Sequence, residues 1–160
     1  MFNLLTYTLA HVLLSLVGLV AGLIVIGGFM SGKRIDGWTG LFLVTTFLTN
    51  ATGFGFPFTR LLPSHIVAAL SLVVIPVAAA ALYGKHLSGS WRGVFVVGSV
   101  VAVYFNVFVL IAQLFAKVPA LIGLAPTQSA PAFIWTQLLT LAAFLVIGRT
   151  ALRGFRTEPA

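Results

Sequence analysis

The stretch WRGVFVVGSVVAVYFNVFVLIAQLFAK, residues 91 to 117, decides the fold of this chain. As an α-helix it is long enough to cross the roughly 30 Å hydrocarbon core of a bilayer. Polar side chains interrupt it at steps of seven residues, which is nearly two helical turns, so they share one face. They are Arg92, Ser99, Asn106 and Gln113, and Lys117 follows one turn later. Because lipid cannot satisfy such a face, the sequence predicts that it meets protein or water.

The composition of the whole chain is that of an integral membrane protein. Hydrophobic residues make up 60% of its 160 residues and charged residues only 7%, whereas soluble domains carry about 25% charged residues. Spanning segments and short connections account for nearly all residues of the chain. We therefore expect a single polytopic domain, residues 1–160. The net charge of +7 is explained by membrane topology, so we expect a lipid bilayer and no nucleic acid as partner. The absence of cysteine excludes disulfides, thiolate metal sites and iron–sulfur clusters.

Hydropathy predicts an all-α fold, a bundle of five transmembrane helices. The predicted spans are Leu4–Met30, Trp38–Phe58, Leu61–Tyr83, Trp91–Ala116 and Ala132–Gly148. Gly18 and Gly22 form a small-xxx-small pair that lets another helix approach the first span closely. Pro76 predicts a kink within the third span.

Positive charge predicts the orientation of the bundle, with the N-terminus outside and the C-terminus in the cytoplasm. If the loop after the first span is cytoplasmic, seven of the nine Lys and Arg residues lie on that side. These seven are Lys33, Arg34, Lys85, Arg92, Arg149, Arg153 and Arg156. The other two, Arg60 and Lys117, then lie outside. Such an arrangement requires an odd number of spans.

With this orientation, polar side chains from all five spans gather in the outer half of the bundle. They predict an outward-facing pocket that binds, and could conduct, a small polar or anionic ligand. The candidate ligand-binding residues are His65, Asn106, Gln113, Lys117, Asn50 and Gln137. Lys117 and Arg60 would attract an anion, His65 and Gln113 would contact it, and Asn106 would form the floor. The apolar connection after Lys117 would cover this pocket as a lid or close it as a plug.

Two other interpretations stay open. Asn and Gln also hold membrane helices together, at roughly 1 kcal/mol per hydrogen bond, which suits a structural subunit of a larger membrane complex or homo-oligomer. Alternatively, His11 and His65 are axial ligands of haem b in an electron-transfer protein, with Arg60 and Lys117 near the propionates. No other cofactor and no metal are expected. No carboxylate lies within a span, and H-E-x-x-H, G-x-S-x-G and phosphate-loop motifs are absent, which favours a non-enzymatic role.

Two stretches resemble a family of small, uncharacterised bacterial inner-membrane proteins. They are TGFGFPFTRLLPSHIVAALSLVVI, from Thr52 to Ile75, and YFNVFVLIAQLFAKVPALIGLAPTQSAPAF, from Tyr104 to Phe133. The resemblance covers about a third of the chain and implies a location in the bacterial inner membrane. It carries no activity, but its two stretches contain four of the residues selected above, His65, Asn106, Gln113 and Lys117.

Overall fold

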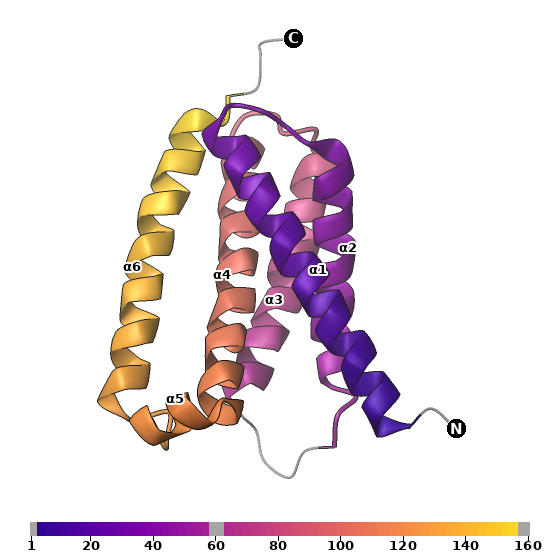
Figure 1. Cartoon of the computed structure of the whole chain (residues 1–160). Coiled ribbons are helices and arrows are strands. Elements are labelled where there is room, and N and C mark those ends of the chain that lie inside the picture. Colours follow the sequence, from indigo (N-terminus) through magenta and orange to yellow (C-terminus); the bar gives the residue numbers. More distant parts are fainter. Residues whose placement is uncertain (1–2, 58–62, 157–160) are drawn as a thin grey trace.

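The computed structural model describes residues 3–57 and 63–156, and this part of the chain is helical with no strand (Figure 1). The all-α class predicted from hydropathy is therefore confirmed. The elements are α1 (Leu4–Met30), α2 (Asp36–Gly53), α3 (Pro63–Ala79), the π-helical segment η1 (Ala80–Gly84), α4 (Trp91–Lys117), α5 (Pro119–Leu124) and α6 (Pro131–Gly154).

Four helical stretches are long and apolar enough to cross a membrane, namely α1, α3 with η1, α4 and α6. They coincide with four of the predicted spans and give the chain the character of a membrane protein. α6 extends to Gly154 instead of ending at Gly148, because basic residues end an apolar run without ending the backbone hydrogen bonding of a helix. α2 is not among the four, because Asp36, Asn50 and five threonines lower its hydropathy.

The second helix also ends earlier than predicted. α2 ends at Gly53, and turn hydrogen bonds follow from Phe54 N–H to Ala51 O (3.3 Å) and from Gly55 N–H to Thr52 O (3.0 Å). The two glycines and the proline at 57 interrupt helical geometry here. The expected limit, Phe58, lies outside the described residues, as do Arg60 and Leu61, the expected start of the third span.

The long helices lie side by side, and the described chain begins and ends at opposite ends of the bundle (Figure 1). One end holds the α1–α2 connection, the η1–α4 connection and the end of α6. The predicted cytoplasmic basic residues lie at or near this end, so we call it the basic end. At the other end, α1 begins, α2 ends, α3 begins and α4 ends, and α5 leads into α6 (Figure 1). We call this the opposite end.

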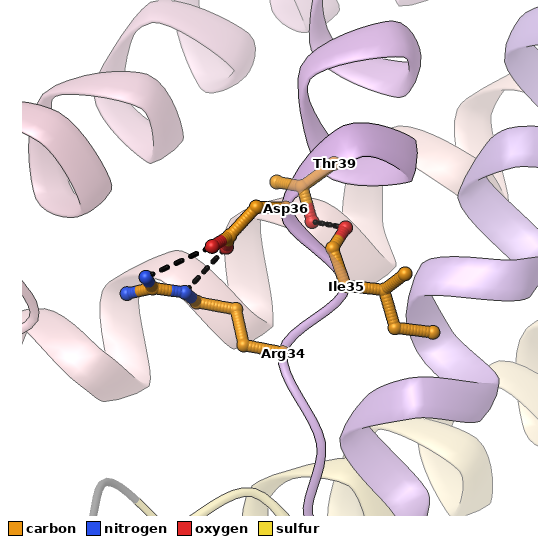
Figure 2. A network of polar contacts seen from close by, with 4 residues as sticks. All are labelled: Arg34, Ile35, Asp36 and Thr39. Atoms are coloured by element: carbon orange, nitrogen blue, oxygen red, sulfur yellow. Dashed lines mark hydrogen bonds and ion pairs between the residues drawn. The ribbon is translucent and has the colours of Figure 1, made fainter.

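α2 begins at the basic end, where Arg34 and Asp36 form an ion pair (Figure 2). The Arg34 guanidinium binds the Asp36 carboxylate through Nε–Oδ1 (2.5 Å) and Nη2–Oδ2 (3.1 Å) contacts. Asp36 lies in the first turn of α2, where a negative charge is favoured by the helix dipole. One turn later, the Thr39 hydroxyl donates to Ile35 O at 2.9 Å. Both charged side chains are exposed, so the pair contributes little to stability.

Small residues bring α1 against α2 and α4. A Cβ atom on Gly18 would lie 3.1 Å from the hydroxyl oxygens of Thr45 and Thr46, and one on Gly22 would lie 2.9 Å from the Phe42 ring and even closer to Val103. A larger side chain at Gly22 would therefore force its neighbours to shift, and one at Gly18 would be tightly packed. The close packing expected from the small-xxx-small pair is confirmed, with α2 as the partner at Gly18 and both α2 and α4 as partners at Gly22.

α6 is attached mainly at the basic end. Phe155 packs with Phe29 and Phe95, at ring-centroid distances of 4.8 and 6.2 Å. The Arg92 guanidinium of α4 donates to Leu152 O at 3.1 Å and to Phe155 O, so it satisfies carbonyls at the C-terminal end of α6. Elsewhere α6 exposes a long row of apolar side chains, including Leu138, Leu139, Leu145 and Val146.

Candidate functional site

The polar residues along α4 differ in their surroundings, because those toward the basic end contact protein and those at the opposite end are exposed. Arg92 is bonded to the end of α6, and Ser99 is fully buried. Asn106 donates through Nδ2 to the Thr46 hydroxyl of α2 at 3.3 Å. Gln113 and Lys117 are exposed at the opposite end. The first three therefore meet protein, as the sequence predicts, and only the last two are available to a ligand from outside.

Asn50 and Asn106 belong to one hydrogen-bonded layer that joins three helices. Asn50 donates through Nδ2 to Thr46 O at 2.7 Å and to the Ser71 hydroxyl of α3 at 3.0 Å. Since Asn106 donates to the Thr46 hydroxyl, the layer runs from α4 through α2 to α3. Asn50 is 8% exposed and Ser71 is fully buried. These bonds are the interhelical contacts that polar residues make inside membrane bundles.

Gln137 joins α6 to α4, donating through Nε2 to Phe108 O at 3.1 Å. Its Oε1 atom is buried and has no hydrogen-bond partner in the described part of the chain, and neither have the hydroxyls of Thr49 and Ser99. An unpaired buried oxygen costs about 1–3 kcal/mol unless water or a ligand group satisfies it. These three atoms are therefore places where a bound water is expected.

A second polar group lies at the opposite end, where α1 meets the end of α2. The Tyr7 hydroxyl donates to Thr52 O at 2.6 Å, and His11 Nδ1 lies 2.9 Å from the Thr52 hydroxyl. The rings of Tyr7 and His11 both pack edge-on against Phe56, at 4.9 and 5.0 Å between centroids. All four residues are partly buried. This end of the bundle therefore presents an ordered imidazole.

The contact between Thr52 and neutral His11 is compatible with either tautomer of the ring. The Thr52 hydroxyl has one hydrogen and lies 2.7 Å from Leu48 O and 3.2 Å from Thr49 O of its own helix. When the hydroxyl donates to one of these carbonyls, His11 donates from Nδ1–H to the Thr52 oxygen. In that tautomer Nε2 is an acceptor, which can receive a proton donor or coordinate a metal.

Lys117 is the cation associated with this end. It is the last residue of α4, which ends at the same end of the bundle at which α1, the helix of His11, begins (Figure 1). Gln113 precedes it by one helical turn and is also exposed. His65, in the first turn of α3, is partly buried and lies 5.9 Å from Phe54 between ring centroids. Lys117 and His11 thus lie at the same end of the bundle (Figure 1), whereas Asn50, Asn106 and Gln137 make helix–helix contacts.

The connection after Lys117 is folded. It forms α5 and then a small apolar cluster in which Ala125 packs with Ala112 and Phe133. The Phe115 and Phe133 rings meet edge-on at 5.6 Å, which ties the end of α4 to the start of α6. The connection therefore contacts α4 and α6 at Ala125, although no residue of α5 is buried. Whether it acts as a lid or a plug stays a prediction.

Two grooves open on the sides of the bundle, and both are apolar. One, of about 350 Å³, lies between α2 and the α3–η1 stretch, and the other, of about 490 Å³, lies between α3 and α4. None of the predicted ligand-binding residues lines either groove, and neither do His11 and His65. Within residues 3–57 and 63–156, no group of three or more His, Cys, Asp or Glu side chains could hold a metal ion.

Sequence reasoning missed Tyr7 and Thr52. Tyr7 precedes His11 by one helical turn and so shares its face, which was a usable signal. Thr52 gave no such signal, because its contact with His11 depends on how α1 and α2 cross.

No protein-family model matches this chain, and comparisons with curated proteins and with solved structures also give no match. The resemblance to small inner-membrane proteins therefore stays a prediction, and function has to be argued from the site.

Proposed function

We propose that this chain is a five-span protein of the bacterial inner membrane that binds a small anion at its outward-facing end. The bound anion would still carry a proton donor, as bicarbonate and dihydrogen phosphate do. The observation that carries the proposal is the imidazole of His11, held 2.9 Å from the Thr52 hydroxyl at the end of the bundle where α4 ends in the cation Lys117. The inner-membrane location is supported by the resemblance described above.

The burial pattern of α2 supports its role as the fifth span. Its polar residues Thr39, Thr46 and Asn50 are buried, whereas its apolar residues Val44 and Leu48 are exposed. A helix in water would show the reverse pattern, because apolar side chains are then turned toward the core. Eighteen residues extend about 27 Å, close to the thickness of the hydrocarbon core. Five spans would place the basic end in the cytoplasm and the opposite end outside.

The residues at the opposite end favour a ligand that carries both a negative charge and a proton that it can donate. The Lys117 ammonium attracts an anionic oxygen, and it offers donors only. Neutral His11 would offer an acceptor at Nε2, in the tautomer that donates from Nδ1 to Thr52. A ligand with one negative oxygen and one O–H group satisfies both residues at once. Gln113 and His65, from α4 and α3, would supply the remaining contacts. Asn106, bonded to Thr46, would lie beneath the site and support it.

The electrostatic attraction sets the scale of the expected affinity. Two unit charges 4 Å apart gain roughly 4 kcal/mol at the effective dielectric constant of a protein surface. Part of this gain is lost to desolvation and to ordering of the lysine side chain. Hydrogen bonds to the ligand, at about 0.5–1.5 kcal/mol each, would offset this loss. A net binding free energy of about −4 kcal/mol corresponds to a dissociation constant near 1 mM. The site therefore suits a ligand that is abundant, and binding should weaken as salt is added.

Titration calorimetry with sodium phosphate tests the proposal. At a pH where dihydrogen phosphate is present, purified protein should bind phosphate with millimolar affinity, and Lys117→Gln should weaken binding at least tenfold. Sulfate, which has no proton to donate to His11, should bind several-fold more weakly. Arg149→Gln removes an exposed cation from α6 and is the matched control. Equal binding by the Lys117→Gln and Arg149→Gln proteins would refute the assignment.

Haem b binding remains a second candidate, favoured by one observation. Histidines that bind a metal almost always donate their other ring N–H to an oxygen, and His11 can do so to Thr52. His65 would have to supply the second axial ligand. Absorption spectra of air-oxidised and dithionite-reduced protein test this directly, since a Soret band and sharp reduced bands would move the function to electron transfer.

A structural role in a larger assembly is favoured by a different observation. Only Phe133, Gln137 and Ala151 of α6 are buried, so this helix has a broad apolar face that the bundle does not cover. Lipid or another protein would cover it. A defined homo-oligomer, or constant co-purification with one membrane complex in mild detergent, would support this alternative.

A further inference from the structure

The groove between α3 and α4 has a uniform lining. Its walls are Val73, Val74 and Val77 on α3 and Gly93, Val94, Val97, Gly98 and Val101 on α4, and it encloses about 490 Å³. Pockets that hold small molecules span roughly 300–1,000 Å³. The lining carries no side-chain hydrogen-bonding group, so a peptide or polar ligand would lose its hydrogen bonds there. The groove therefore suits an apolar occupant, and a lipid acyl chain is one.

At the basic end, a single connection joins the two helices that form the walls of the groove. η1 continues α3 to Gly84, and the chain then turns back through residues 85–90 into α4. Lys85 and Trp91 stand at this turn, with the Lys85 ammonium 5.6 Å from the centre of the Trp91 ring. Both side chains are exposed. A cation and an interfacial aromatic residue therefore lie where the groove reaches the membrane surface.

The charges around this turn do not neutralise Lys85. Within the described residues, the acid of the chain is Asp36, and it is paired with Arg34. The remaining charges at and near the basic end are positive, including Arg92, although its guanidinium is bonded to carbonyls of α6. An anion at Lys85 therefore meets no nearby opposing carboxylate in this part of the structure. Basic residues at the end of an intramembrane groove are the pattern that recognises acidic lipid headgroups.

We propose that the α3–α4 groove binds one anionic phospholipid, with an acyl chain along the valine walls and the phosphate at Lys85. The apolar lining and the complementary charge support this proposal, which is independent of the anion site at the opposite end. An acyl chain matches the groove because it is narrow, flexible and free of polar groups. The headgroup fixes the lipid because the Lys85 ammonium and the Trp91 indole N–H can both donate to its oxygens.

Tryptophan quenching by brominated lipids tests this proposal. Trp38→Phe and Trp135→Phe leave Trp91 as the only tryptophan of the chain. The full chain is reconstituted into phosphatidylcholine vesicles containing brominated phosphatidylglycerol or, separately, brominated phosphatidylcholine at the same mole fraction. Fluorescence is normalised to vesicles with the same headgroups and no bromine. We expect quenching by the brominated anionic lipid to exceed that by the brominated neutral lipid several-fold.

Variants separate headgroup binding from acyl-chain binding. Lys85→Gln should abolish the preference for the anionic lipid, whereas Arg149→Gln, an exposed cation on α6, should preserve it. Val77→Phe with Val97→Phe fills the groove and should reduce quenching by the anionic lipid to the neutral level. Val146→Phe adds the same ring to the exposed face of α6 and should change nothing. Circular dichroism and thermal melting establish that each variant is folded before it is compared.

Three results would overturn the proposal. Equal quenching by anionic and neutral lipids would mean that no headgroup is selected. An anionic preference that survives filling of the groove would mean adsorption to the basic surface alone. Quenching that falls as the protein-to-lipid ratio rises would mean that a second copy of the chain occupies the groove instead of lipid.

Discussion

Arg92→Met should release the end of α6 from the bundle. Arg92 lies in the first turn of α4, and its guanidinium donates to Leu152 O and Phe155 O. These carbonyls belong to the C-terminal end of α6, where the backbone has unpaired acceptors and the helix dipole favours a cation. Methionine keeps an unbranched side chain but removes every donor. The substitution therefore tests one specific attachment without opening a large cavity.

The size of the effect follows from the bonds that are lost. Hydrogen bonds to a charged group contribute about 1.5–3 kcal/mol each, and Arg92 makes two. Taking the lower value for both gives about 3 kcal/mol for local release of α6. Because each 1.4 kcal/mol is a factor of ten, the open population of this helix end should rise roughly 100-fold. The rest of the bundle should stay folded, since α1, α2, α3 and α4 contact one another independently of this site.

Thiol labelling measures that opening. The chain has no cysteine, so Ala151→Cys supplies the only thiol. Ala151 is 0% exposed, and maleimide can reach a thiol there only when α6 detaches. Labelling should be about 100-fold faster in the Arg92→Met background, whereas Arg149→Met, at an exposed position of α6, should leave the rate unchanged. If the two backgrounds label within threefold of each other, Arg92 does not hold α6 and the reasoning fails.

Further predictions concern packing, hydrogen bonding, topology and cofactor content. Gly22→Val should prevent folding or lower the melting temperature sharply, because the valine side chain would overlap neighbouring helices. Gly27→Val is the control, because no atom of a neighbouring element lies within 4 Å of that position. Equal melting curves for the two variants would contradict this prediction. Asn50→Leu should cost about 1 kcal/mol in detergent unfolding by removing its bond to α3, and an unchanged midpoint would argue against the layer. Reporter fusions should place the N-terminus outside and the C-terminus in the cytoplasm; both on one side would mean an even number of spans. Protein purified from haem-supplied cells should show no Soret band, since an anion site leaves His11 and His65 unligated, and a band would reverse the preferred function.

The helices were predictable because their signal is local. Long apolar runs define α1, α4 and α6 within a few residues, and glycine and proline after Gly53 explain why α2 ends early. The Gly18–Gly22 crossing was also foreseeable, because close approach of helices requires small residues wherever the partner lies. The mean hydropathy of α2 does not identify it as a membrane-spanning helix. Its polar residues are turned inward, and an average over the helix does not distinguish buried polar groups from exposed ones.

The site was only partly predictable, because hydrogen-bond partners depend on how helices rotate against one another. Regular spacing suggested a single continuous polar face on α4, yet Arg92 is bonded to the end of α6 and Asn106 to Thr46. Spacing along one helix says which residues share a face, but it does not say which neighbour each residue meets. The pairing of His11 with Thr52 is of the same kind, since it joins residues from two helices.

The anion site is the central claim, and ring-nitrogen NMR of protein labelled with ¹⁵N-histidine tests it most directly. The chain has three histidines. His11 and His65 lie at the opposite end of the bundle, and His86 lies in the connection at the basic end and serves as an internal reference. Titration with phosphate through the millimolar range should shift the ring nitrogens of His11 and His65 saturably and leave His86 unchanged, and Lys117→Gln should remove the response. If none of the three moves, or all three move together with ionic strength, the protein has no anion site at this end.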